Sequence, residues 1–104
     1  MTTQIPFSVR FERLADSVAI HSAGEIDIST VPMLSEALHQ ALEQNPPRAI
    51  TIDLSEVTFI DASGLHALLS AQELGLDSGF SLRIQCSTSV RRLADLCCIT
   101  VCSN

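Results

Sequence analysis

The chain has 104 residues, of which 46% are hydrophobic and 17% charged, a composition that suits one globular domain over residues 1–104 and leaves no room for a second. Six basic residues against twelve acidic ones give a net charge of −6, which disfavours nucleic acid and membrane lipids as direct partners. No apolar run reaches the roughly 20 residues that span a bilayer, and the start lacks a signal-peptide pattern, so we expect a cytoplasmic protein.

The first part of the chain predicts two antiparallel strands and a helix. Apolar and polar residues alternate over 7–12, which is typical of a strand with one solvent-exposed face. A short turn leads to a second strand over 17–23, which Gly24 is expected to end. Apolar residues then recur at helical spacing over 30–42, with Thr30 as the expected N-cap.

The rest of the chain predicts a regular alternation of strands and helices. The third strand is expected to end at Ser55-Glu56, with a loop from there to Asp61. Strands are expected over 49–54, 82–85 and 99–102, and helices over 63–77 and 90–97. The order ββαβαβαβ predicts an α/β fold with a mixed, mostly parallel sheet of about five strands and helices mainly on one face.

The most informative stretch runs for thirteen residues from Asp53 to Leu65 and reads DLSEVTFIDASGL, a strand, a short connection and a helix start. The segment Gly24-Glu25-Ile26-Asp27 precedes the first helix, and Val90-Arg91-Arg92-Leu93-Ala94-Asp95-Leu96 forms the late helix. Together these segments closely resemble the signature of STAS domains, particularly the anti-sigma-factor antagonists. The resemblance covers the chain from about residue 7 to residue 101.

This resemblance implies a protein that acts by binding and not by catalysis. An antagonist of this kind binds an anti-sigma factor that has a histidine-kinase-like ATPase fold, and the sigma factor is thereby released to transcription. The alternative is a STAS subunit that serves a membrane transporter ATPase or a signalling scaffold through the same surface. The sequence does not decide whether the chain forms a homodimer, and it predicts no cofactor.

The expected docking surface consists of the loops 25–29 and 61–65 and the exposed face of the second helix. Loops at the carboxyl ends of parallel strands are exposed and are held by a rigid scaffold. Asp61 is also expected to cap the second helix, a role compatible with a partner contact, whereas Asp27 could be a plain solvated acid. The residues expected to bind the partner are Glu25, Asp27, Asp61, Ala62, Ser63, Gly64 and Leu65.

Phosphorylation control is expected to be weak. In the family that this chain resembles, the residue after the motif aspartate is commonly a Ser or Thr that the partner kinase phosphorylates, and the added charge breaks the complex. This chain has Ala62 at that position, which has no hydroxyl group. Ser63 is the candidate substitute, but a shift of one residue on a helix turns the side chain by about 100 degrees.

The sequence argues against catalytic and metal sites. Asp61, Ser63 and His66 superficially suggest a nucleophile with its base, but residues three apart on one helix seldom form that geometry. The chain contains neither a G-x-S-x-G elbow nor a phosphate-binding G-x-x-x-x-G-K loop. Cys97 and Cys98 are adjacent and belong to no C-x-x-C pair, so we expect no zinc site.

Four cysteines crowd into the last fifth of the chain: Cys86, Cys97, Cys98 and Cys102. If residues 99–102 form a strand, the alternation of side chains points Cys86 into the core and Cys102 away from it, so a bond between the two is not expected. Cys98 stands where the resembled family often ends the third helix with Gly. We therefore predict reduced thiols within the monomer, with Cys102 as the thiol that reacts, and a redox-sensing module as a third hypothesis.

Overall fold

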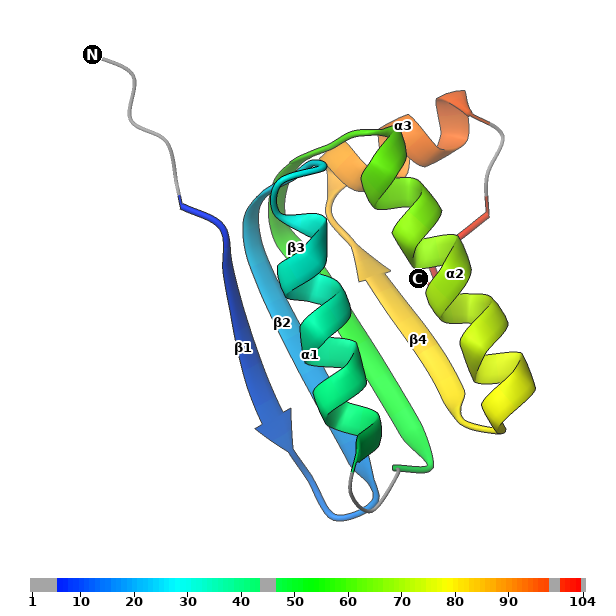
Figure 1. Cartoon of the computed structure of the whole chain (residues 1–104). Helices are drawn as coiled ribbons and strands as arrows, with labels where there is room; N and C mark the ends of the chain where they lie inside the picture. Colours follow the sequence, from blue (N-terminus) through cyan, green and yellow to red (C-terminus); the bar gives the residue numbers. More distant parts are fainter. Residues whose placement is uncertain (1–5, 44–46, 98–99, 104) are drawn as a thin grey trace.

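The computed structural model describes residues 6–43, 47–97 and 100–103 (Figure 1). One four-stranded sheet has the order β1-β2-β3-β4, in which β1 runs antiparallel to β2 and the other two pairs are parallel. The predicted α/β class and mixed sheet are confirmed, although the described residues form four strands and not five. The elements are β1 (Ser8–Arg13), β2 (Ser17–Ile26), α1 (Val31–Glu43), β3 (Ala49–Ile60), α2 (Ala62–Ser78), β4 (Ser81–Cys86) and α3 (Thr88–Leu96).

The core lies between the sheet and the helices α1 and α2, which lie side by side across one face of it (Figure 1). The helix α3 lies at one end of the sheet and contacts β3 and β4. Ile20, Ile52 and Ile84 are register partners on β2, β3 and β4, and each is at most 1% exposed. Leu68 of α2 is likewise fully buried. The alternation of buried and half-buried residues along β2 follows from this one-sided cover. No helix in the described part of the chain is long and apolar enough to cross a membrane.

Two of the strands are longer than the sequence pattern predicted. β2 continues through Gly24 to Ile26, and β3 continues past the expected end to Ile60. The pairing of β2 with β3 shifts register twice, between His21 and Ala23 and between Gly24 and Glu25. At each shift β3 has one residue more than β2, which is the geometry of a β-bulge.

The bulges change the spacing of the buried residues on β3. Leu54, Val57 and Ile60 are buried, whereas the two residues between each pair are exposed. A period of three does not match the period of two that identifies a strand, and the segment therefore reads as a loop in the sequence. The predicted loop from Glu56 to Asp61 is wrong for this reason.

The segment 100–103 does not form the predicted final strand, and residue 99 lies outside the described residues. The segment nevertheless lies against β4, because the backbone N–H of Ser103 donates to the carbonyl oxygen of Ile84 at 2.7 Å and the Ser103 hydroxyl accepts from the Ile84 N–H at 3.0 Å. Val101 is 1% exposed and belongs to the core. The segment therefore covers part of the outer edge of β4.

Cys86 and Cys102 form a disulfide, with their Cα atoms 5.7 Å apart, so the prediction that they would not bond is wrong. The prediction assumed the alternation of a strand, and the segment 100–103 has no strand geometry that would turn Cys102 away. Cys86 is 9% exposed, which agrees with the prediction that it points into the core. Cys97, which follows α3, is an exposed free thiol, and Cys98 lies outside the described residues.

Candidate functional site

The neighbouring parallel strands β2 and β3 end together. Ile26 and Ile60 are register partners, and the Asp61 N–H donates to the carbonyl oxygen of Ile26 at 3.2 Å. Each isoleucine begins the same pattern, Ile-Asp-x-Ser, which reads Ile26-Asp27-Ile28-Ser29 after β2 and Ile60-Asp61-Ala62-Ser63 after β3. The fold thus brings two matching aspartate turns to one edge of the sheet, as expected for residues that follow parallel strands.

Asp61 caps α2, as predicted. Its Oδ1 accepts hydrogen bonds from the Gly64 N–H at 3.1 Å and from the Ser63 hydroxyl at 2.5 Å, and its backbone is extended. Gly64 is buried and lets the helix start close to the sheet, since a β-carbon there would lie 2.5 Å from Cγ1 of Ile60. Leu65 is 2% exposed, so this part of the expected docking loop faces the core.

Asp27 orders the turn that leads into α1, and Thr30, the predicted N-cap, directly precedes this helix but its hydroxyl accepts no hydrogen bond from it within the described residues. The Asp27 Oδ1 accepts from the Ser29 hydroxyl at 2.6 Å and from the N–H groups of Ser29 and Thr30 at 2.9 and 3.2 Å. The hydrogen bond from the Ser29 hydroxyl is the main cause of the lowered pKa of Asp27, and it outweighs burial, which acts in the opposite direction. Thr30 instead donates its hydroxyl to the carbonyl oxygen of Glu25 at 2.9 Å.

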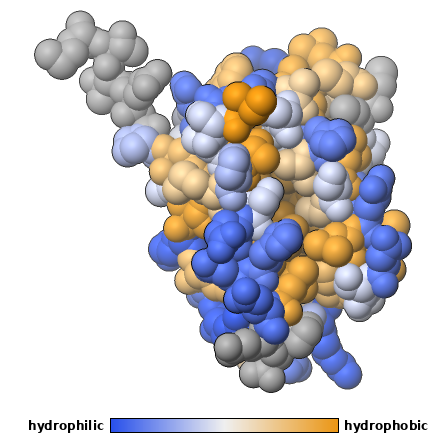
Figure 2. All heavy atoms as spheres, in the orientation of Figure 1, coloured by the Kyte–Doolittle hydropathy of each residue, from blue (hydrophilic) through white to orange (hydrophobic). Residues whose placement is uncertain are grey.

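Three large apolar side chains are exposed near these turns. Ile28 is 80% exposed between Asp27 and Ser29, and Met33 and Phe59 are each 48% exposed. Figure 2 shows that the upper end of the molecule in this view is richer in hydrophobic residues than the lower end. Sequence reasoning missed these residues, although an isoleucine inside an otherwise polar turn is a signal that it could have used.

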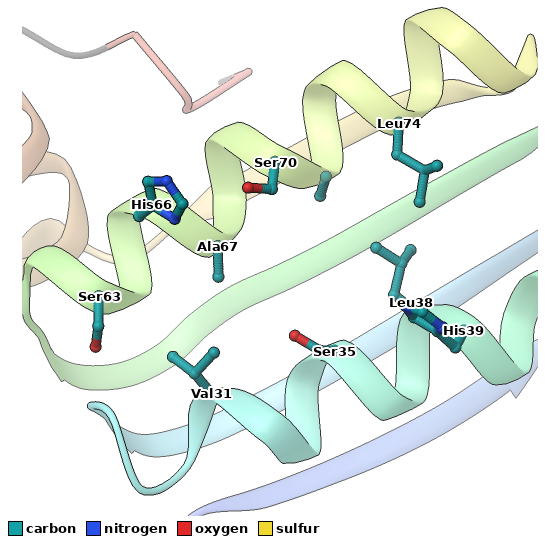
Figure 3. A pocket seen from close by; sticks show the side chains of 10 residues that line it. Val31, Ser35, Leu38, His39, Ser63, His66, Ala67, Ser70 and Leu74 are labelled. Carbon is teal, nitrogen blue, oxygen red and sulfur yellow. The ribbon is translucent and has the colours of Figure 1, made fainter.

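A groove of 440 Å³ lies between α1 and α2 and begins at Ser63. Figure 3 shows Ala67 of α2 and Ser35 of α1 on its facing walls, while Leu38 and Leu74 approach each other farther along. The walls are mostly small or apolar side chains, which leave room for a protruding side chain of another protein. The groove joins the predicted docking face of α2 to α1, a combination that no sequence pattern indicated.

The arrangement around Ser63 does not support a nucleophile. The Ser63 hydroxyl donates a hydrogen bond to the Asp61 carboxylate, and among the described residues no hydrogen bond joins Ser63 to His66. His66 is exposed on α2. Ala62 is the exposed first residue of α2, while Ser63 is half-buried. Within the described parts of the chain, no three His, Cys, Asp or Glu side chains are grouped in a way that could hold a metal ion.

A separate cluster of charged side chains crosses the opposite face of the sheet. The His21 ring bonds through Nε2 to Glu12 at 3.0 Å and through Nδ1 to Asp53 at 2.9 Å. The hydrogen bond with Glu12, and then that with Asp53, raises the pKa of His21. Burial raises the pKa of Asp53, but hydrogen bonds from Ser55 and His21 outweigh it and leave this pKa lowered. The cluster joins β1, β2 and β3 and lies away from the aspartate turns.

Comparisons with known proteins agree with this fold. A family model described as "Mlab, STAS domain" matches residues 9–96. An anti-sigma-B factor antagonist of Listeria monocytogenes is 38% identical over 60 residues, which are 58% of this chain and 52% of that protein. The anti-sigma-F factor antagonist RsfB of Mycobacterium tuberculosis is 41% identical over 59 residues, 56% of this chain and 48% of that protein. The chain spans about half the length of these curated relatives.

The similarity extends to a solved structure over nearly the whole chain. The crystal structure of an anti-sigma factor antagonist from Mycobacterium paratuberculosis superimposes with a TM-score of 0.74 at 27% sequence identity. The superposition covers 95% of this chain and 87% of that one.

Proposed function

Because the chain belongs to the STAS domain family, we propose that it is an anti-sigma-factor antagonist, which binds an anti-sigma factor and thereby releases a sigma factor. The relatives described above carry this name. The observation that carries the proposal is the pair of aspartate turns, Asp27 and Asp61, which end neighbouring strands beside the exposed Ile28. The protein acts in the cytoplasm by stoichiometric binding and performs no reaction.

The turns suit protein binding because they are already ordered. Each carboxylate is fixed by hydrogen bonds from backbone N–H groups two or three residues farther along the chain, so little side-chain entropy is lost when a partner docks. An exposed apolar side chain beside fixed polar groups is a common arrangement at the centre of an interface. Ile28 and Phe59 supply the apolar contact area, and the groove between α1 and α2 extends the surface.

The proposed partner has the histidine-kinase-like ATPase fold that the family resemblance implies. The chain has a net charge of −6, and acidic residues stand at the docking edge, so the complementary surface of the partner is expected to be basic. Electrostatic attraction of this kind mainly speeds association and selects the partner.

Control by phosphorylation is expected to be lost or reduced in this chain. Ala62 occupies the position that is usually phosphorylated in the family, and the Ser63 hydroxyl donates a hydrogen bond to Asp61. Incubation with the partner and ATP should therefore leave Ser63 nearly free of phosphate, as measured by mass spectrometry of the intact protein. Stoichiometric phosphoserine at Ser63 together with loss of binding would overturn this part of the proposal.

The docking surface can be tested by calorimetry with the anti-sigma factor. Asp27→Asn and Asp61→Asn remove the charge but keep a side-chain oxygen that can cap the helix. Each is expected to weaken binding at least tenfold, about 1.4 kcal/mol, if the carboxylate contacts the partner. Asp77→Asn is the matched control, because Asp77 is exposed near the far end of α2.

Folding of each variant is checked by circular dichroism before binding is measured. Unchanged affinity in both Asp27→Asn and Asp61→Asn would exclude these turns as the docking surface. An equal loss in Asp77→Asn would show that only the overall charge matters.

A further inference from the structure

We propose that the Cys86–Cys102 disulfide is a redox clamp, which holds residues 100–103 against β4 when oxidised and releases them when a dithiol reduces it. Release uncovers the backbone of Ile84 on the outer edge of β4. The inference goes beyond the proposed function and does not depend on it, since the clamp lies within one chain.

Besides the disulfide, the clamped segment is held by hydrogen bonds to β4 and α2 and by packing of Val101. The Ser103 N–H and hydroxyl bond to the two backbone groups of Ile84, and the side chain of Gln72 on α2 donates to the carbonyl oxygen of Val101 at 3.3 Å. Val101 adds one fully buried side chain. Figure 1 shows the end of the chain returning beside α2 and β4.

These contacts are nearly balanced by the cost of ordering the segment. Fixing the backbone of four residues costs conformational entropy of the same order as the burial of one valine and three hydrogen bonds contribute. The covalent bond removes most of the freedom that the unclamped segment would gain. Its presence or absence therefore decides whether the segment stays in place.

The rest of the fold does not need the clamp. Apart from Val101, the described buried core consists of residues between Val18 and Ala94. The helix α3 lies inside the closed loop but has its own anchors, because Val90 and Ala94 are buried and the Ser87 hydroxyl donates to the carbonyl oxygen of Val57 at 2.7 Å. Opening the disulfide is therefore a local event.

The chemistry is ordinary thiol–disulfide exchange with a dithiol as the reductant. A thiolate of the reductant attacks Sγ of Cys102, which is half-buried and more accessible than Cys86, and the Cys86 thiolate leaves. The second thiol of the reductant then attacks the mixed disulfide and releases the Cys102 thiolate. Two electrons and two protons pass to the protein, one S–S bond is broken in it, and one S–S bond forms in the reductant.

Reduction exposes a pairing edge. The N–H and carbonyl groups of Ile84 lose their partners on Ser103 and become available to another extended chain. In any reducing compartment a disulfide is usually transient, which fits a clamp that opens and closes.

The test is amide hydrogen exchange, measured residue by residue by NMR on the full chain before and after addition of dithiothreitol. The Ile84 and Ser103 amides are expected to exchange at least tenfold faster after reduction. The amide of Ile52 on β3, in the centre of the sheet, is expected to keep its protection. Reoxidation should restore the original rates.

Two variants make the test specific. Cys102→Ser should show the fast exchange in both conditions, whereas Cys97→Ser, which removes only the exposed thiol, should behave as the unmodified chain does. Unchanged protection of Ile84 and Ser103 on reduction would overturn the clamp. Loss of protection at Ile52 as well would overturn it too, because the disulfide would then be a staple of the whole domain. Alkylation of both Cys86 and Cys102 in protein prepared without reductant would show that the bond does not form.

Discussion

Ser22 places a hydroxyl group in the core of the sheet. It is 3% exposed on the covered face of β2, and its Oγ has no hydrogen-bond partner within the described structure. Its register partner on β1 is the apolar Val9, which offers no side-chain acceptor. A buried hydroxyl without a partner costs free energy, because it gives up its hydrogen bonds to water on folding.

Ser22→Ala is therefore expected to raise the free energy of unfolding by about 1 kcal/mol. The measurement is urea denaturation followed by circular dichroism. Ser17→Ala, at the half-buried start of the same strand, is the control and should change stability little. A destabilised Ser22→Ala would indicate that the hydroxyl is satisfied by a buried water molecule, contrary to this expectation.

Gly64 determines how closely α2 approaches the ends of β2 and β3. A β-carbon at this position would lie 2.5 Å from Cγ1 of Ile60 and 2.8 Å from Cγ2 of Ile26, and both side chains are buried. Gly64→Ala should lower the free energy of unfolding by about 1–3 kcal/mol, the usual cost of overpacking a core. Thermal or urea denaturation gives this value.

Gly79 offers a contrasting control at the other end of the same helix. It has φ +83°, and a β-carbon added there would meet nothing within 4 Å, so alanine introduces backbone strain but no clash. Gly79→Ala is expected to cost about 1 kcal/mol. If Gly64→Ala were as stable as the unmodified chain, the close approach of α2 to the two isoleucines would not limit the packing.

The sequence predicted those elements whose apolar residues keep a single period. The helices and the first half of β3 were found because their buried residues recur at helical or alternating spacing. The second half of β3 was missed because its two bulges are stabilised by pairing with β2, a long-range interaction that leaves no local signal. Residues 99–102 were instead predicted as a strand, and the described residues 100–103 lie against β4 without strand geometry, so the alternation assumed for Cys102 does not apply.

The candidate site was predictable only where a local rule applied. The capping role of Asp61 follows from an acid placed just before a helical stripe, and the structure confirms it. Thr30 directly precedes α1, as predicted for its cap, whereas the hydrogen bonds that Asp27 accepts from Ser29 and Thr30 order the turn before the helix. The contacts of His21 with Glu12 and Asp53 depend on strand order and register, which a single sequence does not reveal.

The free energy of unfolding is expected to reach its maximum in weakly acidic solution. The folded pKa of His21 is raised above 6.5, so its contribution is complete below about pH 6.5 and is lost as the pH rises through the folded value. The folded pKa values of Asp27 and Asp53 are lowered below 3.8, so their contributions are present above about pH 3.8 and are lost as the pH falls further. The free energy of unfolding is therefore expected to be highest between these limits.

Urea denaturation between pH 3 and pH 9 can test this expectation. His21→Gln should remove the decline that follows the maximum on the alkaline side, while His39→Gln, an exposed position on α1, should keep it. An alkaline decline of equal size in His21→Gln would mean that another group is responsible.

The two borders of the sheet differ in the oxidised protein. Beyond β1 the described residues supply no further strand, whereas Ser103 occupies the backbone groups of Ile84 on β4. With Ile84 covered, strand-to-strand contact between copies is expected to be easier through β1 than through this part of β4. A contact that uses β1 of both copies is symmetric and gives a two-fold pair. The described residues 100–103 therefore influence which border of the sheet another chain can approach.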